Sequence, residues 1–300
     1  MLDVNTMKKI LAAFIPFSLL FMSCTSVVDG VYFDEKKKVT LNCVLSTASD
    51  TVTAWLTHTA PIIGENSFQP ITGASILLSE NGLLVGSFTL SDSCAYILPY
   101  KIKPGATYRI EAITNITTLW AETIVPSGSS INFKAVRGEF RIEGVNIEIT
   151  DHPGEDNFYW ITAIEHATQY NQGSHKRIAC GIQSNSMLFD DFNRILIQGS
   201  DYNFEFDYYA RVDDKGFSGK TASMVVLPVC ANPPMDMMVI SADSHFDRYL
   251  KTAMTRYRMD LFTEDFPVLY TPFPIYSNVI NGVGIFGAIN IHTSTFLSNK

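Results

Sequence analysis

The sequence predicts a mainly β protein in which a β-sandwich is followed by a second β-rich domain with one or two short helices. Aromatic residues make up 12% of the 300-residue chain and charged residues only 17%. This composition favours strands and argues against a disordered chain. Short segments alternate between apolar and polar side chains, which is the period of a strand. Turn-forming pairs such as Asn81-Gly82 separate these segments.

The first group of strands is predicted between residues 39 and 126. Apolar side chains there occupy every second position, as in strands that bury one face. Asn81-Gly82 predicts a hairpin turn, and Lys103-Pro104-Gly105 predicts a second turn. About seven short strands with turns between them predict an Ig-like β-sandwich. The clearest segments are residues 41–45, 52–56, 74–78, 96–98, 108–112 and 121–125.

Residues 126–130 read Pro-Ser-Gly-Ser-Ser and predict the boundary between the β-sandwich, residues 39–126, and the second β-rich domain, residues 131–298. A helix is predicted after Ser244, the expected N-cap, because apolar side chains recur at helical spacing towards Tyr257. The other β-rich segments are residues 145–149, 158–164, 195–197, 204–212 and 266–286, with turns at 152–156 and 213–216.

Residues 1–23 are predicted to be a lipoprotein signal peptide. Lys8 and Lys9 precede an apolar run over residues 10–22. This run is shorter than the roughly 20 apolar residues that a helix needs to span a bilayer. Met7 offers an alternative start to Met1, because the charged and apolar regions follow it directly.

Ser23-Cys24 resembles the end of a bacterial lipobox, after which the cysteine thiol is acylated and becomes the first mature residue. Acylated Cys24 would bind membrane lipid, and two or more acyl chains give stable anchoring. Residues 24–38 are then a tether that ends in three lysines. The alternative to a lipoprotein signal is an ordinary secretory signal in which the cysteine is incidental. The alternative to a tether is an edge strand that the lysines protect.

Four further cysteines are Cys43, Cys94, Cys180 and Cys230, and none forms a C-x-x-C pair. Their spacing argues against a zinc ribbon or a thioredoxin-like motif. An exported protein can form disulfides, and four cysteines allow three pairings. Cys43 lies in an alternating segment and is predicted to be a small buried apolar residue. The favoured single bridge joins Cys180 and Cys230.

No motif predicts a catalytic residue, a cofactor site or a metal site. Residues 282–287, Gly-Val-Gly-Ile-Phe-Gly, match G-x-G-x-x-G, but a dinucleotide-binding unit needs a helix after the glycines and an acid about 20 residues on, and none of the 13 residues that follow Gly287 is Asp or Glu. Glycines in that context predict turns or a close approach of strands. Asp190-Asp191-x-Asn193 lacks the spacing of a calcium-binding loop and favours a solvated turn.

The remaining candidates have ordinary structural interpretations. The six histidines form no metal-binding pair and are expected at the surface or in the core. Aromatic residues at 158–160 and 208–209 would offer platforms for sugars, but in strands they favour the core. A pair of carboxylates for glycoside hydrolysis is defined in space, and the sequence nominates none. The net charge of −8, without a basic patch, argues against nucleic acid as a partner.

The region 275–288, Ile-Tyr-Ser-Asn-Val-Ile-Asn-Gly-Val-Gly-Ile-Phe-Gly-Ala, is distinctive. It is similar to the closing motif of a Bacteroidetes lipoprotein family, the domain of unknown function 4249. Residues 73–78, 103–110, 123–126 and 240–242 agree with the same family, so the resemblance runs from Val39 to Ala288. The motif residues, given a structural role, are Ser277, Asn278, Gly282, Gly284, Phe286 and Gly287.

The resemblance implies an exported lipoprotein of two β-rich parts, without established catalytic residues. Such proteins look like companions of TonB-dependent outer-membrane receptors. We therefore expect an outer-membrane-anchored, non-catalytic binding or accessory partner of such a receptor in nutrient uptake. The alternatives are a structural or adhesive envelope protein and an enzyme acting on polysaccharide or peptide. Thr25–Val28 separate Cys24 from the first acid, Asp29. The sequence therefore leaves undecided whether the anchored protein lies on the cell surface or faces the periplasm.

Overall fold

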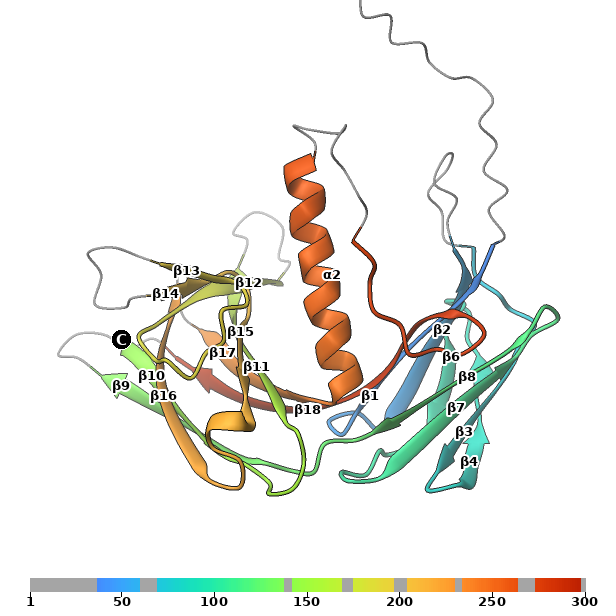
Figure 1. Ribbon diagram of the computed structural model, residues 1–300, viewed down its shortest axis with the longest axis horizontal. Helices are drawn as coiled ribbons and strands as arrows, with labels where there is room; N and C mark the ends of the chain where they lie inside the picture. Colours follow the sequence, from blue (N-terminus) through green and yellow to red (C-terminus); the bar gives the residue numbers. More distant parts are fainter. Residues whose placement is uncertain are drawn as a thin grey trace, which may run out of the picture. The chain divides into compact units, whose positions relative to one another are not determined.

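The computed structural model describes seven ranges of the chain. The predicted signal peptide, Cys24 and most of the predicted tether lie outside them. The chain is mainly β, as predicted from the sequence (Figure 1). The described ranges are residues 37–59, 69–137, 142–168, 175–196, 204–229, 234–263 and 273–297.

Eight strands form the N-terminal half: β1 (Val39–Ser46), β2 (Thr51–His58), β3 (Ser75–Glu80), β4 (Leu83–Ser87), β5 (Thr89–Leu90), β6 (Tyr96–Pro99), β7 (Thr107–Ile113) and β8 (Thr118–Ile124). One layer has the order β5-β6-β2-β1 and the other β4-β3-β7-β8. Alternate residues of both layers, among them Leu41, Ile76 and Tyr108, bury their side chains in a common core. The arrangement is sandwich-like, as expected from the alternating segments.

The predicted hairpin at Asn81-Gly82 is confirmed, because it joins β3 to β4 and both residues have a positive φ. The sequence pattern did not predict β4 and β5 as strands. Leu83 and Leu84 on β4 are 76% and 64% exposed, so this edge strand lacks the buried face that an alternating pattern reports.

The C-terminal half contains β9 (Ser130–Arg137), β10 (Ile142–Thr150), β11 (Phe158–Thr168), β12 (His175–Ser184), β13 (Arg194–Leu196), β14 (Phe204–Phe206), β15 (Ala210–Asp213), β16 (Thr221–Val229), β17 (Met235–Ala242), α2 (Ser244–Thr263) and β18 (Val283–Phe296). The single strand predicted over residues 204–212 is wrong. The backbone bends at Asp207 and Tyr208, so β14 pairs with β12 and β13 while β15 pairs with β11.

Strand β18 joins the two halves in one sheet (Figure 1). Its first part, Val283–Ile289, pairs in parallel with β1, and its second part, Ile289–Phe296, pairs antiparallel with β17. Phe286 belongs to the core of the N-terminal half and Phe296 to the core of the C-terminal half. Residues 126–130 link β8 to β9, and the division into two domains at that point stays a prediction.

The glycines at the start of β18 lie where a side chain would collide with the backbone or with an apolar neighbour. A Cβ at Gly284, whose φ is +121°, would overlap the carbonyl oxygen of Leu41. A Cβ at Gly282 would overlap the side chain of Leu119 and come within 2.7 Å of the Val39 carbonyl oxygen. These glycines therefore permit a close approach of β18 to β1.

The polar residues of the same motif supply hydrogen bonds that a neighbouring strand would otherwise give. The Asn278 amide donates to the carbonyl of Phe286 at 2.7 Å, and the Phe286 N–H donates to the Asn278 side-chain oxygen at 3.0 Å. The hydroxyl oxygen of Ser277 accepts the N–H of Gly284 at 3.1 Å. The motif thus fixes where β18 begins.

Helix α2 begins at a different cap from the predicted one. The carboxylate of Asp243, not the side chain of Ser244, accepts the N–H of Phe246 at 2.8 Å. The same Oδ1 accepts the N–H of Ala288 on β18 at 3.1 Å, and Thr123 on β8 donates to Oδ2. The cap therefore fastens the start of α2 to both halves of the molecule.

Substituting Gly284 by alanine is expected to destabilise the protein by at least about 2 kcal/mol, because both the positive φ and the overlap with Leu41 oppose a side chain. Urea denaturation of a chain that begins at residue 25 measures the change. Gly128→Ala is the matched control, since no atom lies within 4 Å of its Cβ position. Equal stability of the two variants would contradict the close approach of β18 and β1.

Glu80 at the end of β3 is expected to make stability depend on pH. Burial alone would raise its pKa, but hydrogen bonds from Lys103, Tyr100 and Tyr108 outweigh burial and lower the pKa to about 2. The stabilisation is therefore present above the ordinary pKa and is lost as the pH falls towards 2. Glu80→Gln should be less stable than wild type at pH 7, with a difference that shrinks below about pH 4.5.

Urea denaturation between pH 7 and pH 2 tests this prediction. Tyr100→Phe removes one of the three donors to Glu80 and so raises its folded-state pKa, which means that its acid-induced loss of stability should be smaller and complete at a higher pH than that of wild type. A wild-type profile that runs parallel to that of Glu80→Gln would contradict the assignment.

Candidate functional site

Two adjoining cavities lie beside the N-terminal part of α2, and we call them together the α2 groove. The first has a volume of about 590 Å³ and the second about 460 Å³. Asp156 and Ser244 line both cavities, so the two share part of their walls. The walls come from β8, from the turn that precedes β11, and from α2. A groove of this size is in the range of small-ligand sites.

The first end of the α2 groove is acidic. Its lining includes Glu122, Glu155, Asp156 and Asp243, with His245 as the one basic side chain of the set. Glu122 is paired with an arginine on β7, and Glu155 accepts the N–H of Ser127 at 3.1 Å. Asp156 is exposed and has no hydrogen bond or ion pair within the described ranges. Its carboxylate is the group of this end that is available to a ligand.

The capping carboxylate of Asp243 forms the floor of this end. Burial raises its pKa, while the hydrogen bonds from Thr123, Phe246 and Ala288 act in the opposite direction. The net shift is upward, so the ionised form is less favoured here than in water. Since its oxygens already accept these hydrogen bonds, Asp243 serves the fold.

The second end of the groove carries both signs of charge, and its wall contains the bases Arg248 and Lys251, the acids Asp156 and Asp247, and the aromatic residues Phe158 and Tyr276. The Tyr276 ring is fixed between two neighbours. The hydroxyl of Tyr276 lies 2.7 Å from Nδ1 of His245, whose ring stacks on it, and the Arg248 guanidinium lies 5.8 Å from its ring centroid. Arg248 is exposed and has no ion pair among the described residues.

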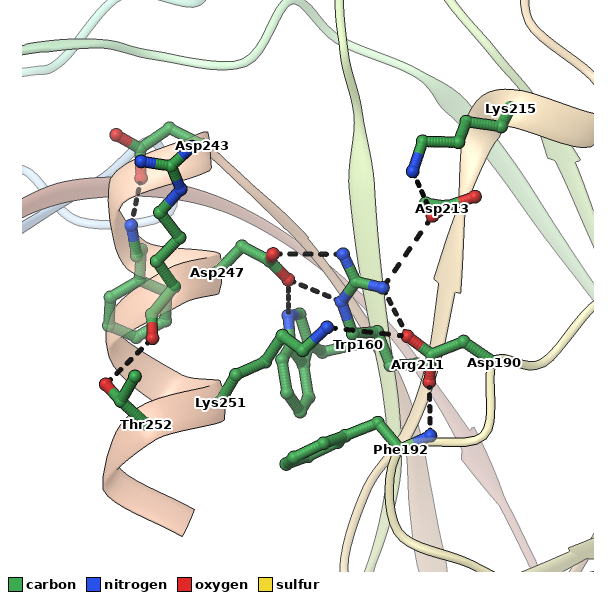
Figure 2. A network of polar contacts seen from close by, with 12 residues as sticks. Trp160, Asp190, Phe192, Arg211, Asp213, Lys215, Asp243, Asp247, Lys251 and Thr252 are labelled. Atoms are coloured by element: carbon green, nitrogen blue, oxygen red, sulfur yellow. Dashed lines mark hydrogen bonds and ion pairs between the residues drawn. The ribbon is translucent and has the colours of Figure 1, made fainter. Parts of the chain in front are cut away.

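A buried ion network lies behind the second end and connects α2 to the sheet. Arg211 on β15 is 4% exposed and donates to both oxygens of Asp247 on α2, at 2.6 Å and 2.9 Å (Figure 2). It also donates to Asp190, and the indole of Trp160 donates to Asp247 at 3.0 Å. Burial opposes the charge of Arg211, but the two carboxylates outweigh burial and raise its pKa.

The network corrects the prediction of a solvated turn at residues 190–193. Asp191 fits the prediction, because its side chain is 86% exposed and pairs with Arg194. Asp190 does not, because it binds Arg211 and lies 3.9 Å from the Lys251 ammonium. Sequence reasoning missed Arg211 as well. The available signal was an arginine between the apolar residues Ala210 and Val212, because an arginine needs a carboxylate when it is buried.

The other predicted residues lie apart from the α2 groove. Cys43 is buried and free, as predicted for a small apolar residue. Cys180 is disulfide-bonded, and because Cys230 lies outside the described residues, their pairing stays a prediction. Tyr159 and Trp160 are buried, whereas Tyr208 is 53% exposed. The described residues hold no cluster of His, Cys, Asp and Glu suited to a metal ion.

Arg211→Met is expected to destabilise the protein by about 3 kcal/mol or more, because it leaves the buried carboxylate of Asp247 without its partner. Arg258→Met is the matched control, since Arg258 pairs with the half-exposed Asp207 at 3.2 Å and such surface pairs contribute about 1 kcal/mol or less. Urea denaturation of both variants measures the difference. Similar losses in both would show that the Arg211 network does not hold α2.

Among the described residues, no helix is both long and apolar enough to cross a membrane. A search of curated proteins found no match. Among solved structures, the chain is similar to a protein described as membrane anchored from Corynebacterium diphtheriae, at 13% identity and a TM-score of 0.21, over 70% of this chain and 55% of that one.

The chain is also similar to the alpha chain of the chicken interferon gamma receptor, at 11% identity and a TM-score of 0.15, over 71% of this chain and 91% of that one. Scores this low carry no argument about fold or function. The profile of the domain of unknown function DUF4249 matches residues 27–295. Since this match covers most of the chain, the protein belongs to the DUF4249 family.

Proposed function

We propose that this protein is a lipid-anchored, non-catalytic binding protein of the bacterial outer membrane, which holds a ligand in the α2 groove and serves a TonB-dependent receptor in nutrient uptake. The observation that carries the proposal is the groove itself, with an acidic end and an end that carries both signs of charge beside one helix. Acylation of Cys24 would supply the anchor, because Ser23-Cys24 follows an apolar run of signal-peptide length.

The charges of the groove favour a ligand that carries both signs. Asp156 and Arg248 line the same cavity, and neither has an ion pair within the described ranges. A molecule with an ammonium group at one end and a carboxylate at the other would pair with both. Short peptides have this chemistry, and their size suits the cavity volumes.

The aromatic residues of the groove support a peptide more than a sugar. His245 and Arg248 both lie against the Tyr276 ring. The guanidinium carbon of Arg211 lies 5.0 Å from the centroid of the Phe158 ring. Rings flanked in this way offer little free face for stacking. Hydrogen bonds and ion pairs at the rim would therefore supply most of the specificity.

The groove is also pre-organised. Asp243 fixes the start of α2, and Asp247 fixes its first turn through Arg211 and Trp160. A wall that is already held in place costs little conformational entropy on binding. The structure of this site thus suits reversible capture of a ligand.

A structural or adhesive envelope role is the second candidate. It is favoured by one observation, the exposed leucines Leu83 and Leu84 on the edge strand β4, because an unprotected apolar edge pairs readily with another chain.

The probe for the α2 groove is the peptide Ala-Ala-Ala with free termini, compared with the same peptide acetylated and amidated at its ends, which carries no charge. Asp156→Asn and Arg248→Gln should each weaken binding of the free peptide about ten-fold, which corresponds to about 1.4 kcal/mol. Titration calorimetry measures the affinity. Lys101→Gln, at an exposed residue outside the lining of both cavities, is the matched control and should leave the affinity unchanged.

Two outcomes would count against the proposal. Equal affinity of the free and capped peptides would remove the argument from charge, and absence of binding at millimolar peptide would remove the ligand class. The partner is tested separately, by copurification of the anchored chain with a TonB-dependent receptor from detergent-solubilised envelopes. Failure to recover one under conditions that preserve known receptor complexes would exclude that part.

A further inference from the structure

An isoleucine stands at the tip of the turn between β7 and β8, where no core covers it. Ile116 is 59% exposed. The turn is held by the hydroxyl of Thr114, which accepts the N–H groups of Ile116 and Thr117 at 3.1 Å and 3.0 Å and donates to the carbonyl of Thr117 at 2.7 Å. A turn fixed in this way keeps the apolar side chain pointed away from the fold.

Two lysines lie beside this turn. A cavity of about 400 Å³ is lined by Lys37, Lys38, Ile116, Thr117 and their neighbours on β1 and at the start of β18, and none of its lining residues is an acid. The chain as a whole has a net charge of −8, so this part of the surface differs in sign from the rest. Ile280, next to the cavity, is 46% exposed.

This surface, formed by Lys37, Lys38, Ile116 and Ile280, includes the first two described residues of the chain, Lys37 and Lys38. Twelve residues separate Lys37 from Cys24, and the fully extended segment between these two residues spans at most about 45 Å. A group held this close to a bilayer meets it at a high effective concentration. Contacts too weak for a free protein therefore become populated in an anchored one.

We propose that this surface rests on the bilayer that carries the lipid anchor, with Ile116 in the interfacial region and Lys37 and Lys38 next to anionic headgroups. The proposal rests on the lipid anchoring stated under the proposed function. Isoleucine and lysine are the residue types that interfacial contacts use, because one gains from apolar burial and the other from the negative surface potential. A second contact besides the anchor would restrict how the α2 groove faces the membrane.

The test tethers the chain independently of acylation. Residues 25–300 with a histidine tag in place of Cys24 are attached to vesicles of phosphatidylethanolamine and phosphatidylglycerol that contain a nickel-chelating lipid. An environment-sensitive fluorophore is placed at Ile116→Cys, with Cys94→Ser removing the partly exposed free thiol. The matched control carries the fluorophore at Ser218→Cys, an exposed residue outside this surface.

We expect about a two-fold rise in fluorescence with a blue shift at position 116 on vesicles, and no change at position 218. Lys37→Gln with Lys38→Gln should reduce the rise. An equal response at both positions would overturn the proposal, and an equal rise on phosphatidylcholine vesicles would overturn the role of the lysines. A response without vesicles that grows with protein concentration would assign the surface to a second copy of the chain.

The outcome of the vesicle experiment does not depend on whether Cys24 is acylated. Mass spectrometry of the amino end of the native protein decides whether Cys24 is acylated. The vesicle experiment decides whether the surface around Ile116 contacts lipid once the chain is tethered.

Discussion

The carboxylate of Asp243 is the interaction on which the arrangement of the molecule depends. It caps α2 through Phe246, accepts the N–H of Ala288 on β18 and receives the hydroxyl of Thr123 on β8. Burying a charge is costly unless hydrogen bonds replace water, and three donors do so here. One side chain thus connects the last strand of the N-terminal half, the final strand of the chain and the helix that walls the groove.

Polar contacts hold the first turn of α2 in place. Among the helix residues whose side chains are described, only Asp247 is buried, and it is held by Arg211 and Trp160. A helix on a hydrophobic core would instead bury an apolar stripe. Charge-assisted hydrogen bonds are directional, so they fix the orientation of the helix as well as its distance from the sheet. The geometry of the α2 groove follows from them.

The final strand explains why the closing motif is so rich in glycine. β18 pairs in parallel with β1 and then antiparallel with β17, so it must approach β1 closely at its start. Gly282 and Gly284 leave the room that this approach needs, while Ser277 and Asn278 supply hydrogen bonds at the point where the strand begins. A motif that resembles a nucleotide-binding signature by spacing alone therefore serves strand packing.

The sequence by itself determined the β class, the hairpin at Asn81-Gly82 and the helix that follows residue 243, because periodicity and turn chemistry are local properties. It also suggested that the glycines mark a close approach of strands. Only the tertiary structure decided that β18 joins both halves, that Asp243 caps the helix, and that Asp190, Arg211 and Asp247 meet. These contacts join residues far apart in the chain, and local patterns carry no information about which distant partner compensates a buried charge.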